Sequence, residues 1–129
     1  MLNSVLFYTG VFFLFILLSG FWVRRSGKPY PSGIFNIHKL IGLGTGVYLI
    51  RTVYLTNRVT PLSPAQWIAT GITALLFIVT VVAGGLLSIF AEGGLKNMGA
   101  ATQNAISLIH EFSPYIIIAA TGWTLYLLL

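Results

Sequence analysis

The sequence predicts an all-α membrane protein, a single domain of four transmembrane helices in an up-down bundle. Of its 129 residues, 57% are hydrophobic and only 7% are charged, whereas soluble domains carry about 25% charged residues. The hydrophobic residues gather in four long segments, each near the roughly 20 residues that cross a bilayer. None alternates hydrophobic and polar residues as membrane β-barrel strands do. A soluble domain and a disordered chain are therefore both excluded.

The first predicted helix covers residues 5–23 and is followed directly by Arg24 and Arg25. A cleaved signal peptide carries its positive charge before the hydrophobic segment and small residues after it. Here the order is reversed. We therefore expect a retained helix whose N-terminus lies outside.

The second and third helices are predicted at residues 34–55 and 64–90. The turn-rich segment SGKPYPSG precedes the second and cannot continue a helix. Ser63 is suited to cap the third helix, and Pro64 to occupy its first position. Both boundaries follow from local turn and capping chemistry.

The fourth helix is predicted at residues 105–129, after the glycine-rich segment AEGGLKNMGAATQ. Pro114 either kinks this helix and frees the carbonyl of His110, or forms its first turn with Ser113. The kink is favoured, because the second alternative leaves only about 16 residues for the span.

The basic residues predict the orientation. Five fall at one face of the membrane and two toward the other: Arg24, Arg25, Lys28, Lys39 and Lys96 against Arg51 and Arg58. The positive-inside rule makes the first face cytoplasmic, so both termini are expected outside, in the cytoplasmic membrane of a bacterium or archaeon. The net charge of +5 thus reflects topology, and no nucleic-acid partner is expected.

The only two histidines, His38 and His110, are the most informative residues. Each lies a short way into a helix that starts on the cytoplasmic side, roughly 6 to 10 Å below that face at 1.5 Å per residue. In a square bundle their helices are diagonal, with axes roughly 11 to 14 Å apart. That spacing suits two imidazoles pointing at one metal with a flat macrocycle between them. We expect one haem b per chain, with both histidines as metal ligands.

Small residues at the same depth favour a cavity for this cofactor. Those expected to contribute to the cofactor site are Gly20, Gly42, Gly46, Gly84 and Gly85. The alternative is close helix packing, which small residues four apart promote in membranes. Arg24, Arg25 and Lys39 are expected to face the haem propionates, although topology and lipid headgroups also account for basic residues there.

Other chemistries have less support. Cysteine is absent, which excludes disulfides and Cys-ligated metal clusters, and zinc normally takes three or four protein ligands. The sequence contains no nucleophile–base set, P-loop or dinucleotide fingerprint. An electron-transfer subunit is therefore expected rather than a self-contained enzyme.

On its four-helix plan and on His38 and His110, the chain resembles the small four-helix membrane cytochromes b. These include the cytochrome b561 group and the haem-bearing membrane anchors of respiratory dehydrogenases. The resemblance implies electron transfer by a membrane-bound haem. The b561 pattern implies four histidines and two haems at opposite faces, whereas this chain has ligands for one haem.

The expected function is that of a b-type haem-binding electron-transfer protein, a subunit of a larger respiratory or photosynthetic complex, with its haem near the cytoplasmic face. Expected partners are membrane lipids, other membrane subunits or further copies of the chain, and a quinone. One alternative is a cofactor-free structural accessory subunit. Another is a small four-helix transporter, which is disfavoured because the first three hydrophobic segments contain no carboxylate.

Overall fold

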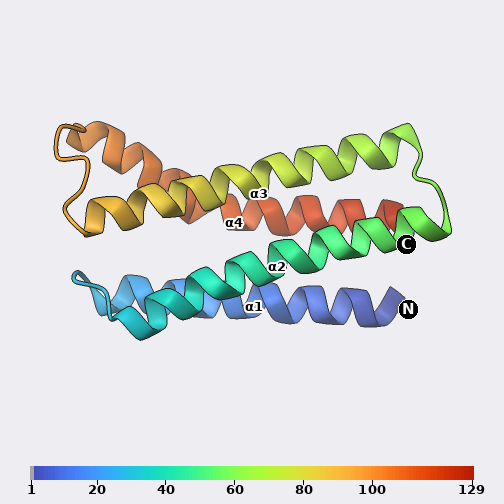
Figure 1. The fold of residues 1–129 in the computed structure, drawn as a ribbon, viewed down its shortest axis with the longest axis horizontal. Coiled ribbons are helices and arrows are strands. Elements are labelled where there is room, and N and C mark those ends of the chain that lie inside the picture. Colours follow the sequence, from blue (N-terminus) through green and yellow to red (C-terminus); the bar gives the residue numbers. More distant parts are fainter. Residues whose placement is uncertain (1) are drawn as a thin grey trace.

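The computed structural model describes residues 2–129 as four helices joined by short connections (Figure 1). Their bounds are α1 Leu2–Ser26, α2 Ser32–Val59, α3 Pro64–Ala91 and α4 Ala100–Leu128. All four are long and apolar enough to cross a membrane. The predicted fold class is therefore confirmed.

Successive helices run in opposite directions, so the bundle has two distinct ends (Figure 1). At one end α1 and α3 finish and α2 and α4 begin; we call it the histidine end, because both histidines lie near it. The other end, where the described chain starts and finishes, is the terminal end.

Capping chemistry places the start of α3 where the sequence predicted it. The Ser63 hydroxyl accepts a hydrogen bond from the Gln66 backbone N–H (3.4 Å), and the Gln66 side chain accepts one from the Ser63 N–H (2.7 Å). Pro64 follows at the first helical position. This reciprocal capping box satisfies two backbone donors that the helix itself cannot.

The predicted bounds of α4 were too short, and its proline lies inside the helix. The helix begins at Ala100, so polar residues that were assigned to the preceding loop form its first turns. Pro114 therefore sits in the helix interior, where it removes the N–H that would otherwise bond to the carbonyl of His110. Figure 1 shows α4 bending along its first half. The alternative in which Ser113 and Pro114 start the helix is wrong.

The bundle consists of two helical hairpins that are packed more closely within themselves than against each other. α1 packs along α2 to form the first hairpin, and α3 packs along α4 to form the second; contacts from α1 to α4 and from α2 to α3 are few. Figure 1 shows the two pairs as separate layers. We call the boundary between them the seam.

Small hydroxyl side chains, more than large apolar ones, fill the interior. The buried polar residues are all serine or threonine: Thr9, Ser19, Thr45, Thr52, Thr73, Ser88, Ser113, Thr121 and Thr124. Large hydrophobic residues such as Leu40, Ile50 and Ile68 are mostly exposed on the outer surface. This distribution is typical of helices packed in a membrane, where small residues allow close approach and lipid solvates the apolar exterior.

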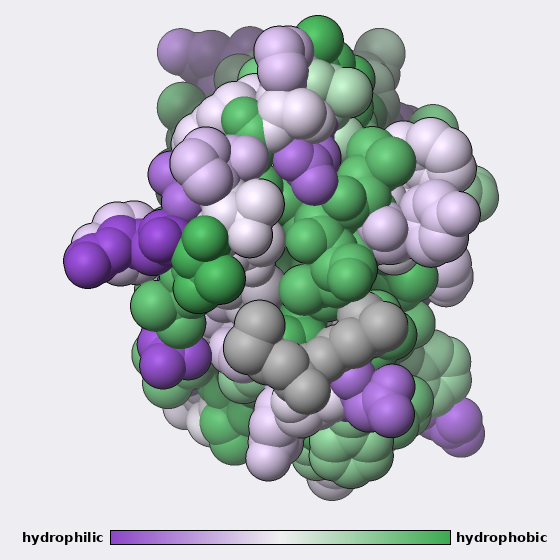
Figure 2. Space-filling model, turned by 90° about the vertical axis from the view of Figure 1, so that its right-hand side faces the viewer, coloured by the Kyte–Doolittle hydropathy of each residue, from purple (hydrophilic) through white to green (hydrophobic). Residues whose placement is uncertain are grey.

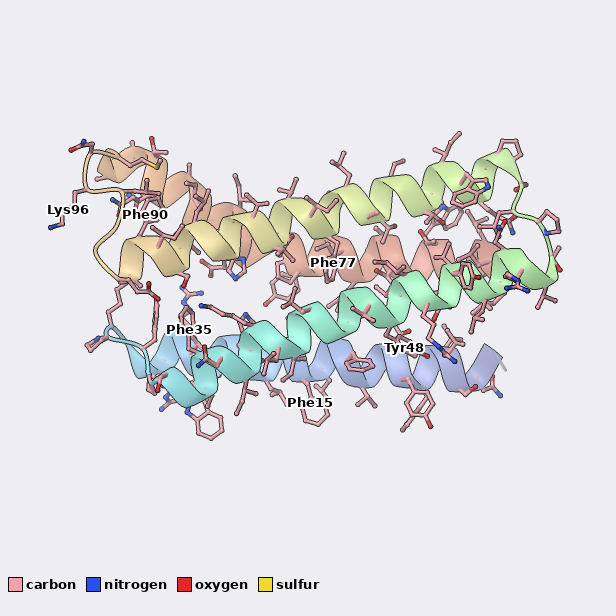
Figure 3. The ribbon with its side chains drawn as sticks, in the orientation of Figure 1. Phe15, Phe35, Tyr48, Phe77, Phe90 and Lys96 are labelled. Atoms are coloured by element: carbon pink, nitrogen blue, oxygen red, sulfur yellow. The ribbon has the colours of Figure 1, made fainter. Side chains whose placement is uncertain are left out.

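Figure 2 looks onto the terminal end, where hydrophobic residues form a central band and hydrophilic residues lie mostly toward the rim. In the side view of Figure 3, Phe15 points from α1 away from the bundle, whereas Phe77 projects from α3 toward the seam.

Candidate functional site

The two histidines meet across the seam. His38 lies near the start of α2 and His110 in the first half of α4, so one comes from each hairpin. Their ring centroids are 6.3 Å apart and their planes are perpendicular, at 90°. Both side chains are half-buried. The structure thus brings together the two residues that sequence reasoning singled out by their matched depth.

The Ser19 hydroxyl of α1 orients His38. Ser19 Oγ lies 2.9 Å from His38 Nδ1 and 3.1 Å from the carbonyl oxygen of Ile16, which also interacts with the His38 ring. With the hydroxyl donating to Ile16, its oxygen accepts from Nδ1–H, and in that tautomer Nε2 keeps the lone pair.

A backbone carbonyl has the same effect on His110. Its Nδ1 lies 3.1 Å from the carbonyl oxygen of Thr80 on α3. A carbonyl oxygen can only accept, so His110 Nδ1 donates to it, and in the neutral imidazole Nε2 carries the lone pair. In both rings the nitrogen with an identified hydrogen-bond partner is Nδ1. The Nε2 atoms, one from each hairpin, are the nitrogens that could bind a Lewis acid.

A glycine lies against the edge of each imidazole. A Cβ at Gly20 would stand 3.0 Å from His38 Cε1, and a Cβ at Gly84 would stand 2.7 Å from His110 Cε1. Real Cβ atoms rarely or never approach so closely, so any side chain at Gly84 would displace the His110 ring. Both glycines therefore keep space for imidazoles held in these orientations.

The other predicted glycines have different surroundings. A Cβ at Gly46 would stand 2.9 Å from the ring of Phe77, so this glycine lets α2 and α3 approach in the middle of the seam (Figure 3). A Cβ at Gly42 or Gly85 would meet no atom within 4 Å, and Gly85 is exposed. Neither of these two glycines contacts a histidine.

Two of the three basic residues predicted to face propionates, Arg24 and Lys39, already have protein partners. Arg24 forms an ion pair with Glu111, which joins α1 to α4. Lys39 donates a hydrogen bond to the Ser88 hydroxyl of α3 (3.0 Å) and lies 4.1 Å from the centre of the Phe35 ring. Arg25 is exposed.

Sequence reasoning missed Glu111 as the partner of Arg24 and Ser88 as the partner of Lys39. For Glu111 a signal was available, because it adjoins His110 and carries the charge opposite to that of Arg24, which follows the first span at a similar depth. Both contacts cross the seam close to the histidine pair, and they hold the hairpins together at that end.

The donor set suits a metal that needs two axial protein nitrogens. Residues 2–129 contain no cluster of three or more histidine, aspartate or glutamate side chains, so a conventional three-ligand zinc site is not formed. Two imidazoles bound through Nε2 to one metal place their ring centres about 6 Å apart, since metal–nitrogen bonds are about 2 Å long. The observed 6.3 Å matches that arrangement.

No protein-family model, curated protein or solved structure matches this chain. What the protein does must therefore be inferred from its own geometry.

Proposed function

We propose that this chain is a b-type haem-binding membrane protein that transfers electrons, with one haem held in the seam by His38 and His110. The observation that carries the proposal is the pair of imidazoles, one from each hairpin, whose ring centroids lie 6.3 Å apart. Each Nδ1 has a hydrogen-bond partner, Ser19 for His38 and the Thr80 carbonyl for His110. Metal-ligating histidines characteristically donate their other ring N–H to such a partner, which fixes the tautomer and raises ligand basicity.

The bound haem would supply one-electron redox chemistry, with a potential set by its axial ligands and surroundings. The chain's own residues do the rest. Ser19 and the Thr80 carbonyl hold the imidazole planes perpendicular, and Gly20 and Gly84 leave room for them. The lipid-facing helices exclude bulk water. Arg24, Arg25 and Lys39 provide positive charge at the end where propionates would emerge.

The setting of this haem is also part of the proposal. Five of the seven basic residues lie at the histidine end, so that end is taken as cytoplasmic, with both termini outside. In this setting the protein would exchange electrons with a membrane quinone, with neighbouring subunits of a respiratory or photosynthetic complex, or with further copies of itself.

A reduced optical spectrum tests the proposal. Protein purified from haem-sufficient cells should show a b-type α-band after dithionite treatment. His38→Ala and His110→Ala should each lose that band, and the double variant should be little worse than either single variant, since the two groups share one site. Absence of bound haem in the wild type would favour the cofactor-free accessory subunit instead.

A further inference from the structure

A cavity lies in the terminal half of the seam, away from the histidines. It is bordered by α2, α3 and α4 and has a volume of about 430 Å³. Its inner end is formed by Gly46 and Phe77, and its outer end by Asn57 and Trp67. Cavities of this size hold small molecules, and most such sites are apolar with a few placed polar groups.

The lining of this cavity is uncharged. None of the residues that border it, all within the described chain, is acidic, basic or histidine. Burying an ionic headgroup without a partner is strongly unfavourable. The molecule that fits is therefore neutral, and its apolar body matches side chains such as Leu49 and Ile78.

Unpaired hydroxyls identify the polar feature of that molecule. Within residues 2–129, the Oγ1 atoms of Thr9, Thr70 and Thr121 are buried without a hydrogen-bond partner, and Thr121 is only 2% exposed. Thr70 and Thr121 line this cavity, whereas Thr9 lines another one, between α1 and α4. By contrast, Thr45, Thr52 and Thr56 donate to the carbonyl four residues earlier in their helix.

Thr70 and Thr121 are therefore hydrogen-bond donors that the protein leaves unused. Thr121 also borders a second cavity, between α1 and α4. Thr70 lines the first cavity and not the second. A substitution of Thr70 therefore tests binding in the first cavity specifically.

We propose that this cavity binds a neutral, lipid-soluble carbonyl compound, whose oxygen accepts hydrogen bonds from Thr70 and Thr121 and whose apolar body lies along Phe77. Two sources offer this chemistry, the ring carbonyl of a quinone and the ester carbonyl of an uncharged acyl lipid. The site rests on its own residues and stands whether or not a haem occupies the histidine pair.

Trp67 provides the readout, because it lines the cavity. In the full chain carrying Trp22→Phe and Trp123→Phe, Trp67 emission is followed during titration with a decyl-substituted benzoquinone, with a monoacylglycerol and with phosphatidylcholine, each in detergent. At least one of the two neutral probes should give a saturable response, and the one that does identifies the source. Phosphatidylcholine should not saturate.

Two matched pairs of variants connect the response to the cavity. Ala74 borders it and Ala119 does not, so Ala74→Phe should abolish saturation while Ala119→Phe preserves it. Thr70→Val should weaken binding about tenfold, the effect of losing one good hydrogen bond. Thr56→Val, in which the lost bond is intrahelical, should leave binding unchanged.

The proposal is overturned if both neutral probes give only a linear, partition-like response, if phosphatidylcholine saturates equally, or if Thr70→Val and Thr56→Val bind alike. Should Ala74→Phe lose helical circular dichroism, the threonine pair still decides the question.

Discussion

The two hairpins place a histidine in the same position by different means. In each, the first helix ends at the histidine end and contributes a glycine, and the second helix begins there and carries the imidazole that covers it. Gly20 and His38 form this pair in the first hairpin, and Gly84 and His110 in the second. The chain has no recognisable sequence repeat, yet the local arrangement recurs.

The support behind each ring differs chemically. His38 relies on a side chain, the Ser19 hydroxyl, whereas His110 relies on the backbone carbonyl of Thr80. A single substitution can remove the first partner. The second persists whatever residue occupies position 80, as long as α3 stays helical. The orientation of His110 therefore depends on backbone geometry that a comparison of residue types would overlook.

The hairpins also differ in how their helices are joined. In the second, hydroxyl pairs link α3 to α4, with Thr73 bonded to Thr124 (2.8 Å) and Thr80 to Ser113 (2.7 Å). In the first, aromatic contacts dominate toward the terminal end, where the Tyr48 ring packs against Tyr8 and Phe12. The second hairpin is the more firmly cross-linked scaffold.

The largest loss of haem should come from a substitution that fills the space occupied by the His110 ring. Gly84→Val places a branched side chain where even a Cβ would stand 2.7 Å from the His110 ring, so haem content should fall by at least tenfold. Gly85→Val is the matched control on the same helix, with the same propensity change but open space around it. Haem per polypeptide, measured in purified protein, decides the point. Equal haem content in the two variants would mean that Gly84 serves only helix packing.

Because His38 is supported by a side chain and His110 by the backbone, substitutions at Ser19 and Thr80 should change haem affinity to different extents. Ser19→Ala should weaken haem affinity about 10-fold to 100-fold, the usual cost of removing a partner that orients a metal ligand. Thr80→Val keeps the carbonyl that contacts His110 and loses only the hydroxyl bonds to Ser113 and to the Leu76 carbonyl, so its haem affinity should change little. Haem transfer to an acceptor apoprotein measures both affinities. If Thr80→Val proved the more damaging variant, the carbonyl contact would not be what holds His110.

The smallest expected effect is on stability, and it comes from the Arg24–Glu111 ion pair that joins the two hairpins. The Arg24 and Glu111 side chains are 71% and 36% exposed, so screening limits their pair to a coupling of about 0.2–1 kcal/mol. A double-mutant cycle with Arg24→Gln and Glu111→Gln in chemical denaturation should give a coupling in that range that shrinks with added salt. Arg25→Gln, which removes a charge from the neighbouring exposed position, should show no coupling to Glu111→Gln.

Much of this architecture could be predicted from the sequence because it follows from composition and local chemistry. Hydropathy located the four spans, and Ser63 with Pro64 marked the start of α3. Matched depth pointed to His38 and His110, because helical rise converts sequence position directly into depth.

Rotation about each helix axis could not be predicted in this way. Gly84 and Gly85 are adjacent in sequence, but only Gly84 contacts an imidazole, and which glycine does so is set by packing between helices. The same is true of the Arg24–Glu111 pair, whose partners are far apart in sequence. Polar residues before the fourth hydrophobic segment hid the start of α4 at Ala100, because hydropathy does not report helix propensity.

The most direct test of the central claim is electron paramagnetic resonance of the oxidised, haem-loaded protein. Imidazole planes at 90° predict a low-spin ferric signal of the highly anisotropic kind that perpendicular bis-histidine ligation produces, and its loss in both His38→Ala and His110→Ala. A high-spin signal in the wild type, or a low-spin signal that survives either substitution, would contradict ligation by this histidine pair.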